Sequence, residues 1–374
     1  MPGWSHCKNI LCIRADNMGD LIMTAPAFRA LKETFGCRIT VLTSQMGNVI
    51  TPFIPEIDEV IVHDLPWIKT NESTSSGKLF SLMEQIKQHH FAAAVIFTVY
   101  SQNPLPAATL AFMADIPMRL AYCRENPYHL LTDWVPEKEP LNYIQHQVQR
   151  DLDLVATINA TTSNDSLFIH VNESAFQSAF AKIPVLNEPD NNNDWIIFHP
   201  GVSEEKRRYP AHLWIELGKI ITKQLNKKII ITGSSSEKEL AETIQHGIGE
   251  KAYVAAGLFT IEEFIAVINA APLVISVNTS TVHIAAATQT PVIVLYALTN
   301  PQHTPWKVLS KVFPFPVYEE LKSRNEIINY VNTHFFNKPV SFPSPKNIFN
   351  AVTEILQKEI KQKQRQEATG IPAL

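Results

Sequence analysis

Two aspartates stand where the first apolar run of the chain gives way to a helical pattern. Asp16 and Asp20 follow residues 10–13, and Gly19 between them allows a tight turn. A carboxylate at the start of a helix either accepts hydrogen bonds from free backbone N–H groups or takes a proton from an attacking hydroxyl. The sequence leaves both roles open for Asp20, while a structural role has the stronger support for Asp16.

Three consecutive cations follow a later apolar run, residues 195–198. Lys206, Arg207 and Arg208 stand in the loop behind His199. Cationic groups at this place could neutralise a phosphate or a diphosphate. A solvated surface charge explains the same run equally well, so the sequence supports both interpretations.

Hydroxyl residues mark a third candidate site. Thr279, Ser280 and Thr281 lie between the apolar run 273–276 and an alanine-rich helical pattern that contains His283. The free N–H groups of a helix start, together with these hydroxyls, predict a cradle for an anion. His283 is as consistent with a packed core residue as with a ligand contact.

Small residues form a fourth turn at residues 233–237, after the apolar run 228–231. Glu237, or a serine such as Ser235, could reach a ribose hydroxyl. A cap by Ser236, with Glu237 complementing the helix dipole, is the simpler interpretation.

Metal sites and cofactors are not predicted. The sequence Asp151-Leu152-Asp153 is a DxD in a helical pattern, which favours surface charge over a metal site. The four cysteines show no CxxC spacing, which favours free thiols in a reducing compartment (Cys7, Cys12, Cys37 and Cys123).

Composition and charge narrow the function classes. The 374 residues are 45% hydrophobic and 18% charged, which supports a large core and excludes a disordered chain. The net charge of -4 gives no electrostatic footprint for nucleic acid. No apolar run reaches the roughly 18 residues that cross a bilayer, and the start of the chain lacks the features of a signal peptide. We expect a cytoplasmic protein.

Short apolar runs alternate with amphipathic stretches in both halves of the chain. This alternation predicts doubly wound α/β sheets, and continuous apolar runs suit parallel strands covered on both faces. The predicted strands are residues 10–13, 39–42, 60–62, 94–97, 195–198, 228–231, 273–276 and 292–295, and the predicted helices are 21–35, 77–88, 107–114, 211–223, 236–248, 261–269, 282–288 and 346–364.

The polar, turn-rich stretch 187–194 separates the two halves and predicts a linker. We expect an N-terminal domain over 1–186, a C-terminal domain over 195–340, and a final helix and tail over 341–374. The basic run 358–365 indicates a solvated helix end, with a peripheral contact at the inner face of the cytoplasmic membrane as the alternative.

In order and spacing, these places resemble the motifs of glycosyltransferase family 9, the heptosyltransferases of lipopolysaccharide core assembly. Residues 17–27 are similar to the family's N-terminal signature, and 199–201 with 207–210 are similar to its HPG…KRWP segment. Residues 276–287 and 299–301 resemble its SNDSGPMHLAAALG…PTDP region. The resemblance implies a GT-B fold, with two Rossmann-like domains facing a cleft and a C-terminal helix that packs back toward the first domain.

The resemblance also implies an activity, which is inverting, metal-independent transfer of a sugar from a nucleotide-sugar donor such as ADP-heptose. The acceptor would be a hydroxyl of the lipopolysaccharide core or of another glycan, free or lipid-linked. By position Asp20 would be the catalytic base. The first domain would bind the acceptor, with Asp16, Asn17 and Arg119 as candidates. The loops 98–103 and 119–124 are further candidates, and Arg119 and Arg124 would suit an anionic group. The second domain would bind the donor through the residues that match the family's donor motifs, namely Arg207, Arg208, Ser235, Leu258, Asn278, Thr279, Ser280, Thr281 and His283.

The sequence departs from the family pattern at two positions. Asn278 stands where the family has an aspartate that contacts the donor sugar, and Ser280 stands where it has a glycine. An amide keeps the hydrogen bonding of a carboxylate but loses its charge. These departures motivate one alternative, a nucleotide-sugar-binding protein with an altered donor or without catalysis. A second alternative is a nucleotide-sugar epimerase on the same fold, although the series of motifs does not resemble that family.

Overall fold

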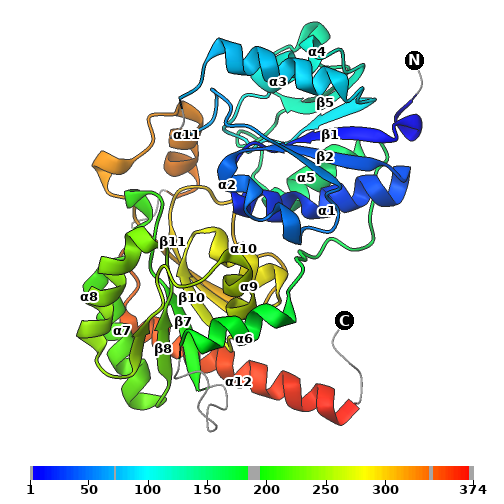
Figure 1. The fold of residues 1–374 in the computed structure, drawn as a ribbon. Helices are drawn as coiled ribbons and strands as arrows, with labels where there is room; N and C mark the ends of the chain where they lie inside the picture. The colour runs from blue at the N-terminus through cyan, green and yellow to red at the C-terminus, as the bar shows by residue number, and fades with distance from the viewer. Residues whose placement is uncertain (1–2, 71–72, 184–193, 337–339, 370–374) are drawn as a thin grey trace. The chain divides into compact units, whose positions relative to one another are not determined.

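The structure, a computed structural model, describes residues 3–70, 73–183, 194–336 and 340–369. It contains two compact units (Figure 1). Unit 1 runs to His170 and includes Pro301–His303 and Asn325–Val331. Unit 2 contains Val171–Asn300, Thr304–Arg324 and the chain from Asn332 onward. Each unit is therefore built from more than one stretch of the chain.

In the described part of unit 1, six parallel strands form one sheet in the order β3-β2-β1-β4-β5-β6. The central strands β1 and β4 consist almost entirely of buried residues, because helices cover both faces of the sheet. The four strands predicted for this half are confirmed, and β5 and β6 are additional. The strands are β1 Asn9–Ile13, β2 Arg38–Thr43, β3 Glu59–Val62, β4 Ala93–Ile96, β5 Met118–Cys123 and β6 Asp133–Pro136.

Helices lie on both faces of this sheet (Figure 1). They are α1 Met18–Phe35, α2 Gln45–Asn48, α3 Ser76–Gln88, α4 Leu105–Met113 and α5 Gln147–Ala156. α1 packs along α5, while α3 and α4 contribute Leu82, Ile86 and Leu110 to a core shared with β1 and β4. α1 begins after its cap Asn17 and ends at Gly36, whose φ of 56° is one that glycine adopts readily.

Unit 2 repeats this plan with its own parallel sheet, in the order β12-β11-β10-β7-β8-β9. The four strands predicted for this half are confirmed as β7, β8, β10 and β11. The short strand β9 and the edge strand β12 are additional. The strands are β7 Trp195–His199, β8 Lys228–Ile231, β9 Ala252–Val254, β10 Val274–Val277, β11 Val292–Ala297 and β12 Ser310–Phe315.

Two layers of helices cover the second sheet. α7 Ala211–Gln224, α8 Lys238–Ile248 and α12 Pro345–Thr369 share one core, in which Trp214, Ile244 and Ile348 are buried together. α6 Glu173–Ala181, α9 Ile261–Ala270 and α10 Ser280–Ala287 form the other layer, where α6 packs on α9 and α9 on α10.

The described part of the final helix packs into the core of unit 2, and its packing toward the first domain stays a prediction of the resemblance. Ile348, Val352 and Ile355 of α12 lie in the core of unit 2, beside α7. Their spacing forms one apolar stripe, and the sheet of unit 2 offers the face that buries it. α11 (Glu326–His334) contributes its residues up to Val331 to unit 1.

Unit 2 also begins earlier in the chain than the sequence indicates. α6 lies within the predicted N-terminal domain, yet Ser178 Oγ and Lys182 Nζ each donate to the carboxylate of Glu263 on α9 at 2.6 Å. Although burial raises the pKa of Glu263, its bonds to Lys182 and Ser178 lower it to about 2. The predicted linker 187–194 lies outside the described residues except for Asp194.

Each sheet has one point at which the strand order reverses. In unit 1 the chain moves outward from β1 to β3 on one side and from β4 to β6 on the other, so the segments after β1 and β4 meet at the same edge. In unit 2 the segments after β7 and β10 meet in the same way. Ligands of parallel α/β sheets bind at such switch points, beyond the carboxyl ends of the strands.

Candidate functional site

Arg14 follows β1 and binds two aspartates at the switch point of unit 1. Its side chain is fully buried, with Nη2 2.9 Å from Asp20 Oδ1 and Nη1 3.3 Å from Asp16 Oδ2. A buried guanidinium requires such partners, because an unpaired charge away from water is costly. These ion pairs fix the positions of both carboxylates.

Asp20 is 7% exposed and lies in the first turn of α1. Its Oδ2 accepts the backbone N–H of Asn17 at 3.2 Å, which caps the helix. Its Oδ1, which Arg14 also binds, lies 3.7 Å from Nε2 of His303. Asp20 therefore caps α1 and also takes part in a charged cluster.

Asp16 is held by the loop that follows β4. Gln102 Nε2 donates to Asp16 Oδ1 at 2.5 Å, which joins the two segments of the switch point. Burial raises the pKa of Asp16, although Arg14 lowers it. Asn17 is exposed at the cap of α1. The structure thus brings Asp16, Asn17 and Asp20 together.

Asp151 belongs to the same buried cluster, which corrects its predicted place on the surface. It is 1% exposed on α5, where Thr24 Oγ1 donates to Oδ2 at 2.7 Å and Gln147 Nε2 donates to Oδ1 at 2.8 Å. Burial raises its pKa to about 6, although Arg14 lowers it. The prediction failed because α5 packs against α1, so only Asp153 of the pair stays partly exposed.

Arg119, which the resemblance offers as an acceptor residue, holds a turn within unit 1. It is 7% exposed, and its guanidinium donates to the carbonyl oxygens of Ile116, His129 and Leu130. The same group lies over the ring of Phe112, 5.3 Å from its centroid. These contacts tie β5 to the segment that precedes β6.

Arg207 lies at the switch point of unit 2. Its Nη1 donates to Asn278 O at 3.2 Å, and its Nη2 lies 3.2 Å from a carboxylate oxygen of Glu204. Its Nε–H is buried and has no hydrogen-bond partner within the described chain. Buried donors are normally satisfied, so an arginine with a spare donor near a helix start suits an anionic ligand.

Arg208 is in a different setting from its neighbour. Its Nε donates to both carboxylate oxygens of Glu205, at 2.7 and 2.8 Å, in an exposed pair. The structure therefore separates the two arginines that the sequence grouped together. Arg207 faces the end of β10, and Arg208 is paired at the surface.

The start of α10 presents the predicted cradle. Thr279 caps the helix in an extended conformation and Ser280 begins it, and both are half-buried. Thr281 and His283 are almost fully buried behind them. The first N–H groups of a helix lack carbonyl partners and carry partial positive charge, so this place favours an anion.

Asn278 joins the ends of β10 and β11. Its Nδ2 donates to Thr299 Oγ1 at 3.2 Å and to Ala297 O at 3.4 Å, and its Oδ1 accepts the N–H of Ala297 at 3.1 Å. This arrangement needs a donor and an acceptor on one side chain, which an amide has and a carboxylate lacks. The departure from the family pattern thus has a structural reason, and the amide is engaged inside the fold.

The loops after β8 and β9 approach each other closely. Gly257 N donates to Gly233 O at 2.9 Å, and a Cβ on Gly257 would lie 2.9 Å from Ser235 Cα. The φ of Gly257 is +76°, which a side chain would strain. Leu258 is 43% exposed and offers apolar surface at this place. The structure therefore brings Ser235 and Leu258 together.

His199 ends β7 as a neutral imidazole. Its Nδ1 lies 2.9 Å from Thr232 Oγ1, and its ring packs against Phe264 with 5.5 Å between centroids. Burial lowers its pKa to about 4, which Glu237 only partly offsets. Gly201 allows the side chain of Glu237 to come this close to the end of β7, because a Cβ on Gly201 would lie 2.2 Å from the carboxyl carbon of Glu237. His199 thus adds no positive charge near neutral pH.

Sequence reasoning did not place Arg14, Asp151 or His303 at this site, whereas Gln102 lies in the loop 98–103 that it named as an acceptor candidate. Arg14 gave a usable signal, since a cation adjoining a buried strand implies buried acids nearby. His303 gave none. Its contact with Asp20 joins distant parts of the chain, as does the contact between Gln102 and Asp16, which are 86 positions apart.

The described residues hold no group of three His, Cys, Asp or Glu side chains that could bind a metal ion. Within the same ranges, no helix has the length and apolar character needed to cross a membrane. All four cysteines are free and buried.

Comparisons with known proteins give a consistent result. A family model described as glycosyltransferase family 9 (heptosyltransferase) matches residues 79–326. The lipooligosaccharide heptosyltransferase 2 of Haemophilus influenzae is 23% identical over 308 residues, which cover 79% of this chain and 85% of the relative.

Two solved structures share the fold. A family 9 glycosyl transferase from Veillonella parvula has a TM-score of 0.74 at 17% identity and covers 94% of this chain and 98% of its own. The ADP-heptose lipopolysaccharide heptosyltransferase II of Escherichia coli has a TM-score of 0.69 at 19% identity, with 94% and 99% covered. The fold class is therefore the GT-B class of the heptosyltransferases.

Proposed function

Because this chain belongs to glycosyltransferase family 9, we propose that it transfers a sugar from a nucleoside-diphosphate donor to a hydroxyl of a glycan, free or lipid-linked. The observation that carries the proposal is which charged groups lie at the switch points of the two sheets. One holds a nearly buried carboxylate, Asp20, and the other holds Arg207 beside the start of α10. A base and an anion site are the two parts that an inverting transfer requires.

Unit 2 is the donor unit in this proposal. Arg207 and the first N–H groups and hydroxyls of α10, from Thr279 and Ser280, bind the diphosphate. Ser235 lies at the ribose, and Leu258 supplies an apolar surface for the base. The E. coli structure named for ADP-heptose supports an adenine nucleotide, and we propose heptose as the sugar and the lipopolysaccharide core as its acceptor.

The transfer is a single displacement at the anomeric carbon. The acceptor oxygen forms its bond to this carbon while the bond to the diphosphate oxygen breaks, and the configuration inverts. Asp20 takes the proton of the acceptor hydroxyl. The leaving diphosphate carries the developing negative charge, which Arg207 and the start of α10 stabilise. Positioning and charge stabilisation supply most of the rate.

Calorimetric titration with ADP, UDP and GDP tests the donor site. We expect ADP to bind in preference, and Arg207→Ala to weaken it by about tenfold or more, since hydrogen bonds to charged groups are strong. Arg208→Ala is the matched control and should leave the affinity nearly unchanged. A preference for UDP or GDP would reject ADP-heptose as the donor, and no nucleotide binding at all would overturn the proposed function.

A second candidate function is nucleotide-sugar binding without catalysis, and Asn278 favours it. Where the resemblance places an aspartate at the donor sugar, this amide binds Ala297 and Thr299 instead. Under this function ADP-heptose would bind without being consumed, either by water or by any of a panel of glycan acceptors. Release of ADP that depends on an acceptor would reject it.

We propose a cytoplasmic location with a peripheral contact at the inner membrane face, where a lipid-linked acceptor would be available. The four free, buried thiols agree with a reducing compartment. The basic run 358–365 is the sequence basis for the membrane contact, and its side chains from 360 onward lie outside the described residues.

A further inference from the structure

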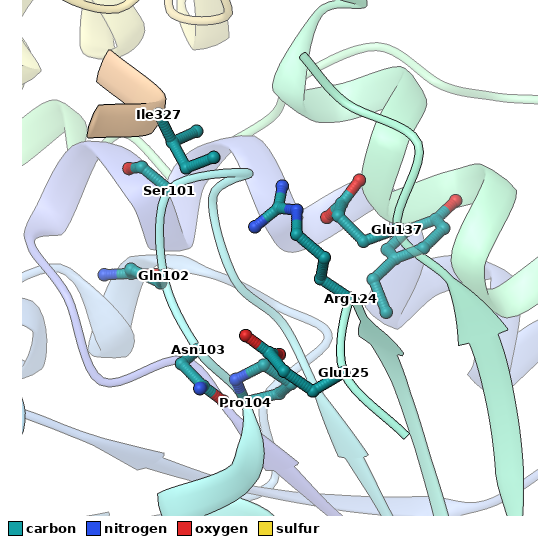
Figure 2. A pocket seen from close by; sticks show the side chains of 9 residues that line it. Ser101, Gln102, Asn103, Pro104, Arg124, Glu125, Glu137 and Ile327 are labelled. Atoms are coloured by element: carbon teal, nitrogen blue, oxygen red, sulfur yellow. The ribbon is translucent and has the colours of Figure 1, made fainter. Parts of the chain in front are cut away.

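A pocket of about 180 Å³ opens beyond the carboxyl ends of β4, β5 and β6 in unit 1 (Figure 2). The loop 101–104 forms one wall, and Arg124, Glu125 and Glu137 form the other. The pocket is smaller than the roughly 300–1,000 Å³ that drug-sized ligands occupy. It therefore has room for one sugar ring rather than for a chain of rings.

The pocket is connected to the charged cluster of Asp20. Gln102 forms part of its wall, and the same amide donates to Asp16 Oδ1 at 2.5 Å. Asp16 in turn shares Arg14 with Asp20. A ligand held in this pocket would thus lie one side chain away from the cluster that contains the proposed base.

The polar groups around the pocket donate and accept. Asn103 Oδ1 accepts the backbone N–H of Leu105 at 2.8 Å, so its NH₂ group is the part suited to a ligand. Arg124 Nη2 is anchored to the carbonyl oxygens of Glu139 and Tyr100 at 2.6 and 3.3 Å. Ring hydroxyls can accept from such amide and guanidinium groups and donate to carboxylates.

The charge around the pocket is unfavourable for an anion. Glu125 is exposed at its rim, and Glu137 lies in its wall, where both carboxylate oxygens bind Arg150. Arg150 also pairs with Glu139 at 2.8 Å. Among the charged residues that line the pocket, one guanidinium (Arg124) therefore stands against two carboxylates (Glu125 and Glu137), and a ligand with its own carboxylate or phosphate would meet like charge.

We propose that this pocket binds one neutral sugar ring of the acceptor and discriminates against rings that carry a carboxylate or a phosphate. The proposal rests on the proposed function, because it identifies the ring as part of the acceptor. It differs from the sequence expectation that Arg119 and Arg124 suit an anionic acceptor. Arg119 is used inside the fold, and Arg124 is outnumbered by carboxylates. Specificity here arises from repulsion as well as attraction.

Ligand-observed NMR on the full chain tests the proposal with matched probes. The neutral probes are the methyl glycosides of glucose, galactose and mannose, and each is paired with the methyl glycoside of its uronic acid. We expect at least one neutral glycoside to bind about tenfold more tightly than its uronate, the ratio that 1.4 kcal/mol of repulsion gives. Glu125→Gln should narrow this ratio, whereas Glu84→Gln, an exposed glutamate on α3, should leave it unchanged.

Two further variants locate the binding. Ser101→Trp should fill the pocket and abolish binding of the neutral glycoside, with circular dichroism as a check on folding. Asn103→Asp keeps an oxygen that accepts the hydrogen bond from Leu105 N–H and adds a negative charge, so it should increase the ratio of the affinities for the neutral glycoside and the uronate. Equal or tighter binding of the uronate, or binding that survives Ser101→Trp, would overturn the proposal, as would failure of every neutral glycoside to bind.

Titration of ADP on the same samples separates the two levels of inference. If ADP binds and depends on Arg207 while no neutral glycoside binds, the pocket proposal fails and the transferase stands. If a neutral glycoside binds in the pocket and no nucleotide binds unit 2, the transferase fails and the sugar specificity of the pocket stands.

Discussion

At the scale of single residues, Arg14 organises the acids around it. Burial lowers its pKa, but Asp20, Asp16 and Asp151 raise it more, so the guanidinium stays charged. Three carboxylates near one cation leave an excess of negative charge in a buried place. Burial raises the pKa of Asp151 to about 6, so this buried acid takes up a proton at a pH only slightly below neutral.

Replacing Asp20 separates its role as a cap from its proposed role as a base. In Asp20→Asn the side-chain oxygen can still accept the Asn17 N–H, but it no longer takes a proton. We expect transfer to fall by about 10²–10⁴-fold while ADP binding stays nearly unchanged. Single-turnover assays and ADP titration measure the two effects.

Asp20→Ala removes both roles and should also lower the free energy of unfolding by about 1 kcal/mol through the lost cap. Asp153→Asn, which changes a partly exposed aspartate on α5, is the matched control. If Asp20→Asn retained transfer and only Asp20→Ala lost it, Asp20 would be a cap alone.

Asp151 gives the fold a defined pH dependence. Its pKa is about 6 in the fold against an ordinary value of 3.8, so between these values the unfolded chain releases its proton first. Stability should therefore fall as pH rises through this range, and Asp151→Asn should remove that loss. The variant's free energy of unfolding relative to the parent should rise by up to about 3 kcal/mol from pH 4 to 7.

Urea unfolding of both proteins at several pH values measures this difference. Any constant cost of the amide cancels, because only the change with pH is compared. A difference that does not vary with pH would show that Asp151 has an ordinary pKa in the fold.

At the scale of elements, the strands that form continuous apolar runs were predictable, including β3 at a sheet edge, whereas the interior strand β5 and the edge strands β6, β9 and β12 were not. β1, β4, β7 and β10 are apolar because both faces are covered, and continuous apolar runs mark them in the sequence. β6 and β12 lie at sheet edges and are partly exposed along their length, so they leave no such run.

The candidate site was predictable to the same degree. Spacing along one turn placed Asp16 and Asp20 together, and the hydroxyl-rich helix start marked Thr279 and Ser280. The contact between Asp20 and His303 joins distant segments, and nothing in the local sequence encodes it. Tertiary packing alone decides such contacts.

The turn at Gly257 links two elements of the proposed donor site. Gly257→Ala would strain a φ of +76° and press a Cβ against Ser235 Cα, so it should displace the loop after β8. We expect a loss of about 1–3 kcal/mol in the free energy of unfolding and weaker ADP binding. Chemical unfolding and titration measure the two quantities.

Gly249→Ala is the matched control for this prediction. Gly249 has a φ of +107° but open space around the position of a Cβ, and it lies before β9 rather than after it. The Gly249→Ala variant should lose stability and keep its affinity for ADP. Equal effects of both variants on ADP binding would remove the Gly257 turn from the donor site.

At the scale of the whole molecule, two separate cores imply two unfolding steps. Ile348 of α12 is fully buried in the core of unit 2, and Ile86 of α3 is fully buried in that of unit 1. Ile348→Ala and Ile86→Ala should each cost about 2–5 kcal/mol, but in different transitions. We expect scanning calorimetry to show that ADP raises the midpoint temperature of only one transition, the one whose midpoint Ile348→Ala lowers. A single transition shifted by both variants would contradict independent units.

The cysteines are distributed so that their reactivity would report the opening of unit 1 alone. All four thiols lie in unit 1 and are buried, and unit 2 contains no cysteine. A thiol sealed from water meets an alkylating reagent only when the chain around it opens, and burial slows the reaction further by raising the pKa, as for Cys37 to about 11. The alkylation rate of each thiol, measured by mass spectrometry, would therefore give the rate at which unit 1 opens around it, for example around Cys7 or around Cys12 inside β1. Unit 2 would contribute no signal.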